Sequence, residues 1–273
     1  MGEISPFVAS VSTRIARHAA AYTAELDADA HPERMSLDTF AVHVEAVLDD
    51  YDPPSARRRH SDTLVFPHLY GAARDPRPDE EGWRVPSAVP AALMAAEVEF
   101  RGPLRLSARQ NTLLAEEYEA IGAQLSEVGL ATHAALAFRR AMALYRVNED
   151  DEAEDRCGLH LARANTRGLP HGLRRWAGQS SYFLCGHGYR PSWLLGWVIL
   201  QMLVFTGVAL LLGGKAVDDT VYMGVTGFLN PPGPGDTQDL PRAVRTLFVV
   251  EAWTGAVSMS VFFALLVRKW FRM

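Results

Sequence analysis

The sequence predicts an all-α protein in which a charged helical N-terminal region precedes two transmembrane helices. One observation is a run of twenty uncharged residues from Trp193 to Leu212. Another is the run from Thr246 to Val267, in which Glu251 is the only charged residue. Because roughly 20 apolar residues cross the hydrocarbon core of a bilayer, each run is long enough to span a membrane. Upstream of both runs, apolar residues recur at the spacing of amphipathic helices.

The N-terminal region is expected to contain helices on either side of a proline-rich segment. Pro6 follows Ser5 and suits the first turn of a helix, and apolar residues recur behind it at helical spacing. A second helix is expected from about residue 36 to residue 48. The many prolines of residues 52–90 predict a long irregular segment or a linker. The expected domains are residues 1–90, residues 91–180 and residues 181–273.

Large, small and aromatic residues between positions 107 and 147 have the spacing of two antiparallel helices that pack closely. Gly122 and Ala134 are small enough for a near approach, and Phe138 would fill the space between the helices. The pattern resembles one tetratricopeptide repeat, whose length is about 34 residues; a plain helical hairpin explains it equally well. Since one repeat cannot bury its own face, we expect it to pack on flanking helices. The resemblance implies a protein partner for residues 107–166.

Composition excludes several classes of function. The net charge of −5 argues against nucleic acid as a partner, and the sequence holds no enzyme motif, so we expect neither an enzyme nor a cofactor. Cys157 and Cys185 lack the spacing of a zinc site or a disulfide framework. Residues 148–155 hold six acids but no calcium-loop glycine. We therefore expect a solvated linker or a helix start there, and no metal.

Basic residues are distributed unequally on the two sides of the expected spans. From Arg156 to the first span there are six arginines and no acids, and the second span is followed by three basic residues and no acid. The connecting segment, residues 213–242, has two basic residues against four acidic ones. Lys and Arg mark the cytoplasmic side of membrane proteins. We therefore expect a multi-pass plasma-membrane protein with both termini in the cytoplasm.

The connecting segment is longer and more apolar than a turn between two anchoring helices requires. Asp218 and Asp219 can begin a short helix near Thr220. The C-terminal end of that helix would direct a partial negative charge toward the Gly/Pro-rich loop that follows. Irregular backbone at membrane depth is tolerated only where it is buried in protein or lines a water-filled cavity. The segment therefore predicts a re-entrant pore helix followed by a pore loop.

Residues 193–272 resemble the two-transmembrane, pore-loop cation channel family, which includes tetrameric bacterial potassium channels. Gly233, Pro234, Gly235 and Asp236 stand where that family has Gly-Tyr-Gly-Asp closing its selectivity filter. The resemblance implies a homotetramer in a lipid bilayer that conducts monovalent cations. It covers under a third of the chain.

Further matches of this resemblance lie in the pore helix and in the second span. Tyr222 and Thr226 fall about where the family has an aromatic residue and a threonine of the pore helix. Glu251 and Gly255 correspond to a glutamate and a hinge glycine of the family's second span. Glu251 either lies behind the filter or in a wet cavity, or it pairs near the outer end of the span with a group such as Thr226. Gly255 is either a gating hinge or part of a close-packing surface.

The filter itself departs from the family pattern of Thr-Val-Gly-Tyr-Gly, whose successive carbonyls replace the hydration shell of potassium. Asn230 and two prolines replace the approach to the filter, and Pro234 replaces the tyrosine. Each proline fixes φ and removes an amide donor. We therefore expect a cation pore without strong potassium selectivity. The alternative is a non-conducting, membrane-anchored helical interaction or scaffold protein that kept the channel architecture.

Overall fold

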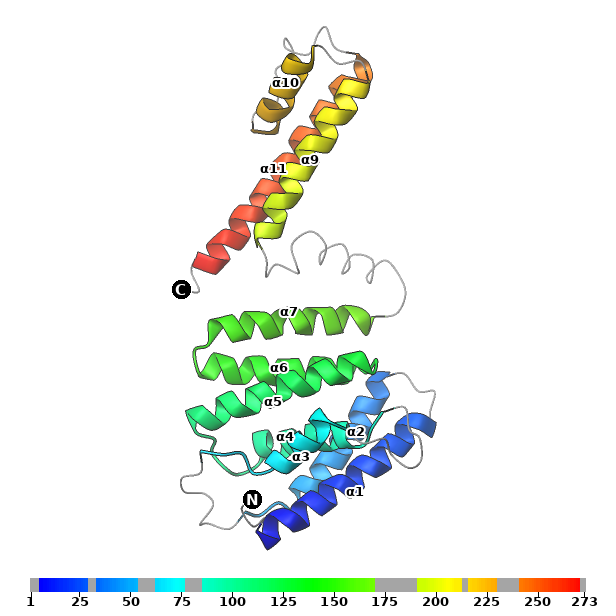
Figure 1. Cartoon of the computed structure of the whole chain (residues 1–273), viewed down its shortest axis with the longest axis vertical. Coiled ribbons are helices and arrows are strands. Elements are labelled where there is room, and N and C mark those ends of the chain that lie inside the picture. Colours follow the sequence, from blue (N-terminus) through cyan, green and yellow to red (C-terminus); the bar gives the residue numbers. More distant parts are fainter. Residues whose placement is uncertain are drawn as a thin grey trace. The chain divides into compact units, whose positions relative to one another are not determined.

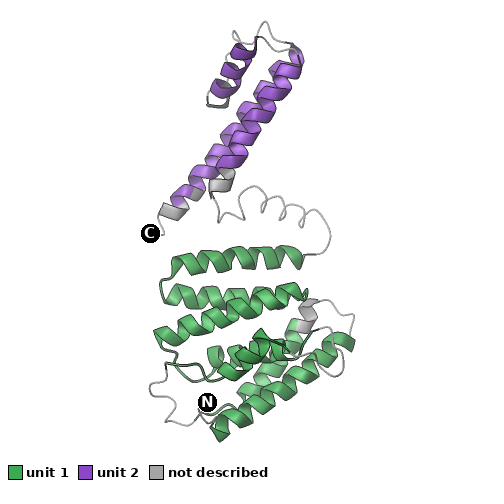
Figure 2. Cartoon of the chain, in the orientation of Figure 1, with its two compact units in different colours: residues 1–175 green, residues 176–273 purple. Residues whose placement is uncertain are grey.

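The computed structural model describes residues 5–28, 33–53, 62–76, 85–169, 191–212, 216–229 and 241–270. Every regular element within these ranges is an α-helix, which confirms the predicted all-α class. The chain divides into two compact units, residues 1–175 and residues 176–273 (Figure 2).

Unit 1 is built around a central helix. Its helices are α1 (Pro6–Ala28), α2 (Glu33–Leu48), α3 (Pro67–Arg74), α4 (Ala88–Arg101), α5 (Ala108–Glu127), α6 (Ala131–Val147) and α7 (Asp151–Arg167). The helix α4 packs against α1, α2, α3 and α5, and its residues from Val89 to Glu99 are all buried. One hydrophobic core runs from Val8 to Ala164. The core therefore continues across position 90, where we expected a domain boundary.

The proline-rich segment is more ordered than we expected, because it contains α3. Pro67 occupies the first turn of this helix, where its missing amide hydrogen has no helical partner to lose. The buried Glu99 of α4 accepts hydrogen bonds from the Val65 and Phe66 amides, both at 3.0 Å, and from the Tyr70 hydroxyl at 2.9 Å. We expected a long irregular segment or a linker here; its described residues include a helix, whose start a distant carboxylate holds in place.

A partly buried ion pair fixes α4 against α5 and α6. The Glu97 carboxylate, only 3% exposed, accepts two hydrogen bonds from Arg140, at 2.9 and 3.0 Å, and one from the Tyr118 hydroxyl at 3.0 Å. The Arg140 guanidinium also lies 4.5 Å from the centre of the Phe100 ring. Charge and packing therefore hold the three helices in one arrangement.

The helices α5, α6 and α7 form a layered stack (Figure 1), with α6 packed against both of the others. The predicted close approach of α5 and α6 is confirmed, because a Cβ atom on Gly122 would lie 2.9 Å from the Phe138 ring. The expected flanking helix is α7, and Asp150 caps it by accepting a hydrogen bond from the Ala153 amide at 3.0 Å. The acidic run is therefore a helix start.

Unit 2 consists of α9 (Pro191–Leu211), α10 (Val217–Leu229) and α11 (Arg242–Trp270), and each of them packs against the other two. In the described part of this unit, one helical stretch, Arg242–Ala264, is long and apolar enough to cross a membrane, and Leu195–Leu211 is a shorter apolar stretch. The expected short helix is α10, which begins at Val217 and so holds the two aspartates in its first turn. Its Gly224 lies so close to the Thr206 side chain of α9 that no larger residue fits without a shift.

Candidate functional site

The outer surface of unit 2 is strongly apolar. Among the described residues, every exposed large hydrophobic side chain other than Val42 and Val147 lies in or beside α9, α10 and α11. Leu203 of α9 is 67% exposed and Trp253 of α11 is 73% exposed. Contiguous apolar surface of this kind is rare on soluble monomers and marks contact with lipid or with other protein.

The interior of unit 2 contains polar as well as apolar side chains, because Gln201, Thr220 and Glu251 are buried in the same unit as the apolar cluster of Ala209, Val244 and Phe248. The Gln201 side-chain amide of α9 donates a hydrogen bond to the Thr254 hydroxyl of α11. That hydroxyl in turn donates to the carbonyl oxygen of Val250 at 2.8 Å. Polar side chains commonly join helices in this way where water is excluded. Exposed apolar side chains around an interior that contains three polar ones differ from the usual arrangement of a water-soluble bundle.

Glu251 is the most unusual group of this interior. Its side chain is fully buried, and neither carboxylate oxygen has a hydrogen-bond partner among the described residues. Leaving a buried polar group unsatisfied costs about 1–3 kcal/mol, and more when the group is charged. Such a group calls for an explanation beyond packing. A proton, a cation or a polar group from outside the described residues would each satisfy it.

The other predicted residues of unit 2 that lie in described helices do not form a cluster with Glu251. The Thr226 hydroxyl donates within α10 to the Tyr222 carbonyl at 2.6 Å, so the pairing of Thr226 with Glu251 that we considered does not form. The Tyr222 side chain is 71% exposed. Gly255 is buried one helical turn after Glu251, on the packed face of α11. That position fits the close-packing role for Gly255, and hinge motion stays a prediction.

The predicted filter residues lie outside the described residues. They are Asn230, Gly233, Pro234, Gly235 and Asp236. Their role in a filter stays a prediction that follows from the sequence resemblance.

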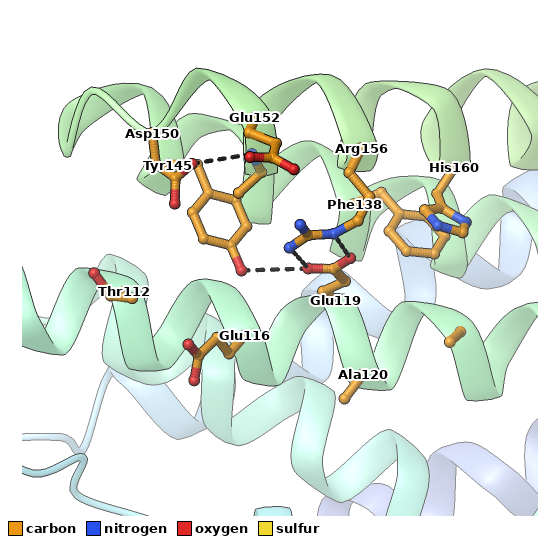
Figure 3. A pocket seen from close by; sticks show the side chains of 12 residues that line it. Thr112, Glu116, Glu119, Ala120, Phe138, Tyr145, Asp150, Glu152, Arg156 and His160 are labelled. Atoms are coloured by element: carbon orange, nitrogen blue, oxygen red, sulfur yellow. Dashed lines mark hydrogen bonds and ion pairs between the residues drawn. The ribbon is translucent and has the colours of Figure 1, made fainter. Parts of the chain in front are cut away.

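Unit 1 has a candidate site of its own, an open groove of about 560 Å³ between α5 and α7. Figure 3 shows these two helices as the walls of the groove, with Tyr145 and Phe138 of α6 between them. Glu119 of α5 crosses the groove to Arg156 of α7, which donates two hydrogen bonds to it, at 2.7 and 2.9 Å. The Tyr145 hydroxyl donates to the same carboxylate at 3.3 Å. This bridge divides the groove into two halves.

The electrostatics of the bridge favour the ionised pair. Burial by itself would raise the pKa of Glu119, but hydrogen bonding and charge from Arg156 outweigh burial, and the pKa lies below its usual range. Burial raises the pKa of the neighbouring Cys157 thiol to about 12, so this cysteine is an unreactive thiol at neutral pH. Burial also lowers the pKa of His160, whose ring stacks on Phe138 with the centroids 5.2 Å apart. The groove therefore holds a stable ion pair and a neutral imidazole at neutral pH.

Sequence reasoning missed two parts of these sites. Gln201 is an amide within an otherwise apolar run, and that alone could have singled it out as a contact between helices. The bridge of Glu119, Tyr145 and Arg156 gave no such signal, because it depends on how three helices stack.

The described residues offer no group of three or more His, Cys, Asp or Glu side chains that could hold a metal ion. No protein-family model, curated protein or solved structure matches this chain. The resemblance of residues 193–272 to pore-loop channels and that of residues 107–147 to a tetratricopeptide repeat therefore stay predictions.

Proposed function

We propose that this chain is a membrane-embedded, channel-like protein that passes monovalent cations when several copies assemble. The observation that carries the proposal is Glu251, a fully buried carboxylate without a described partner inside a helical unit whose outer surface is apolar. Ionisable groups within apolar spans are costly, and they mark ion pathways and proton relays. Lipid is the solvent that accommodates the outer surface of α9 and α11.

In this proposal α9 and α11 both cross the plasma membrane, and both chain termini are cytoplasmic. The 21 residues of α9 would extend about 31 Å at 1.5 Å per residue, close to the thickness of the hydrocarbon core. The 13 residues of α10 are too few to cross, which suits a re-entrant helix that enters and returns on one side.

Assembly follows from the shape of unit 2, because a single three-helix unit cannot enclose a path. The proposed assembly is a homotetramer, as in the family that residues 193–272 resemble. Ala252 and Gly255 are buried within one chain, whereas Ala256 and Val257 of α11 are exposed. The exposed residues of α11 are therefore available for contacts between copies.

The proposed pore discriminates poorly between potassium and sodium. Three prolines, Pro231, Pro232 and Pro234, lie in or beside the loop that corresponds to the family's filter. Each of them removes an amide donor and fixes φ, so the regular carbonyl ladder of a potassium filter is not expected.

The test is a measurement of reversal potentials in asymmetric KCl and NaCl, on purified full-length protein in planar bilayers. We expect a permeability ratio near unity, and we expect Glu251→Gln to change the conductance. The matched control is Ser260→Ala on the same helix, because Ser260 is exposed and its hydroxyl donates, among the described residues, only to the Ala256 carbonyl, at 2.8 Å. Strong potassium selectivity would contradict our interpretation of the prolines.

The second candidate function is that of a non-conducting, membrane-anchored interaction protein. The same prolines favour it, because a filter without its carbonyl ladder can be closed. The observation in unit 1 that supports it is the open groove between α5 and α7. Absence of current from verified tetramers, over a range of voltage and pH, would favour this candidate over the channel.

A further inference from the structure

The groove between α5 and α7 has an acidic half and an apolar half, one on each side of the bridge between Glu119 and Arg156 (Figure 3). The acidic half is lined by Glu116 of α5 and by Asp150 and Glu152 at the start of α7. The apolar half is lined by alanines of α5 and by the stacked rings of Phe138 and His160. A ligand that fills the groove therefore meets carboxylates at one end and apolar surface at the other.

The acidic half keeps an excess of negative charge that the protein does not neutralise. Asp150 is occupied in part as the cap of α7, and Glu119 is paired with Arg156. Glu116 and Glu152 are exposed, and no hydrogen bond or ion pair joins either of them to another described residue. These two carboxylates come from opposite walls, so a cationic group between them would interact with both.

The acidic side chains of the groove do not converge as the ligands of a metal ion would. No set of three or more acidic, His or Cys side chains in the described parts of the chain lies close enough to hold one. A metal requires converging ligands within about 2.0–2.6 Å of one point, whereas an Arg or Lys side chain reaches separate carboxylates through several donors on a long stem. Phosphate-bearing partners, such as nucleic acids and anionic lipids, would be repelled.

We propose that this groove binds an extended, basic segment of a partner protein, with Lys or Arg side chains against Glu116 and Glu152 and an apolar side chain against Phe138 and His160. Tyr145 and the Glu119–Arg156 bridge lie between the two halves of the groove, so they would contact the middle of the segment. Glu119 and Arg156 already form hydrogen bonds with each other, so this pair would position the segment without attracting it. The attraction would come from Glu116 and Glu152. The inference concerns unit 1 alone and holds whether or not unit 2 conducts ions.

The test uses the full-length protein in nanodiscs and a fluorescein-labelled decapeptide of lysine, leucine and serine, with fluorescence anisotropy as the readout. A second decapeptide carries glutamate in place of lysine. We compare Glu116→Gln/Glu152→Gln with Asp38→Asn/Glu127→Gln, a control that removes the same charge from exposed positions outside the groove. Circular dichroism checks that both variants keep their helices.

We expect saturable binding of the lysine peptide, weakened by added salt because the attraction is electrostatic. The groove variant loses two exposed ion pairs with the peptide, so it should bind about 2- to 30-fold more weakly and always more weakly than the control, which stays within about 2-fold. Equal losses in the two variants, or equal binding of the glutamate peptide, would overturn the proposal. The proposal would also be overturned if the protein did not bind the lysine peptide and instead self-associated in a way that requires Glu116 and Glu152.

Discussion

Replacing Arg140 by methionine is expected to destabilise unit 1 by about 3 kcal/mol. The change removes both hydrogen bonds from the guanidinium and leaves Glu97, which is 3% exposed, with the Tyr118 hydroxyl as its one remaining described partner. Breaking a buried ion pair by removing one partner costs about 3–5 kcal/mol. The Arg140 side chain is 30% exposed, so water screens part of the pair and the lower end of that range applies.

Hydrogen exchange of the full-length protein in nanodiscs measures this change, because it reports the opening free energy of α4, α5 and α6 separately from that of unit 2. The double variant Glu97→Gln/Arg140→Met should recover about 2 kcal/mol, since the uncompensated charge is gone and the amide oxygen still accepts from Tyr118. Arg139→Met is the matched control, because Arg139 is exposed and should change stability by less than about 0.5 kcal/mol. If Arg140→Met lowered the opening free energy by less than about 1 kcal/mol, the buried Glu97 carboxylate would not need this arginine as its ion-pair partner.

Three further predictions concern close packing and buried charge. Gly122→Ala should destabilise unit 1 by about 1–3 kcal/mol in the same hydrogen-exchange measurement, because its Cβ would meet an aromatic ring at 2.9 Å. As its control, Gly71→Ala, whose Cβ would meet nothing within 4 Å, should stabilise α3 by about 0.5–1 kcal/mol. Gly224→Ala should loosen α10 from α9 and raise the exchange rate of the α10 amides, because its Cβ would collide with a threonine side chain of α9. Burial raises the pKa of Glu99 although backbone and tyrosine hydrogen bonds oppose the shift. Protonated Glu99 therefore stabilises the folded state fully below the ordinary glutamate pKa, and this stabilisation is lost as pH rises through the higher pKa of the folded state. Melting temperatures measured against pH should show this loss in the wild type and a smaller one in Glu99→Gln.

The sequence predicted those helices whose signals lie within the helix itself or in its neighbour along the chain. Pro6 marks the start of α1, and Gly122 with Phe138 indicates the tight pairing of α5 and α6. The two apolar runs predicted α9 and α11, which lie in unit 2. In each case the information lies within one helix, or within two helices joined by a short turn.

Interactions between distant residues explain what the sequence did not predict. The helix α3 lies among prolines that suggested irregular structure, and it is held by Glu99, more than thirty positions away from Val65. Gln201 and Thr254 lie 53 positions apart, and only the packing of α9 on α11 brings them together. The groove of unit 1 likewise exists only once α5 and α7 have both packed against α6.

Both candidate functions require that α9 and α11 each cross the bilayer, so the topology of unit 2 is the most direct test of the proposal. Asp218→Cys, at the start of α10, and Arg109→Cys, in α5, are introduced singly after both native cysteines are replaced by alanine. A membrane-impermeant maleimide applied to intact cells should label position 218, and it should reach position 109 only after the membrane is permeabilised. Labelling of both positions in intact cells, or of neither before permeabilisation, would contradict the crossing by α9 and with it the proposed function.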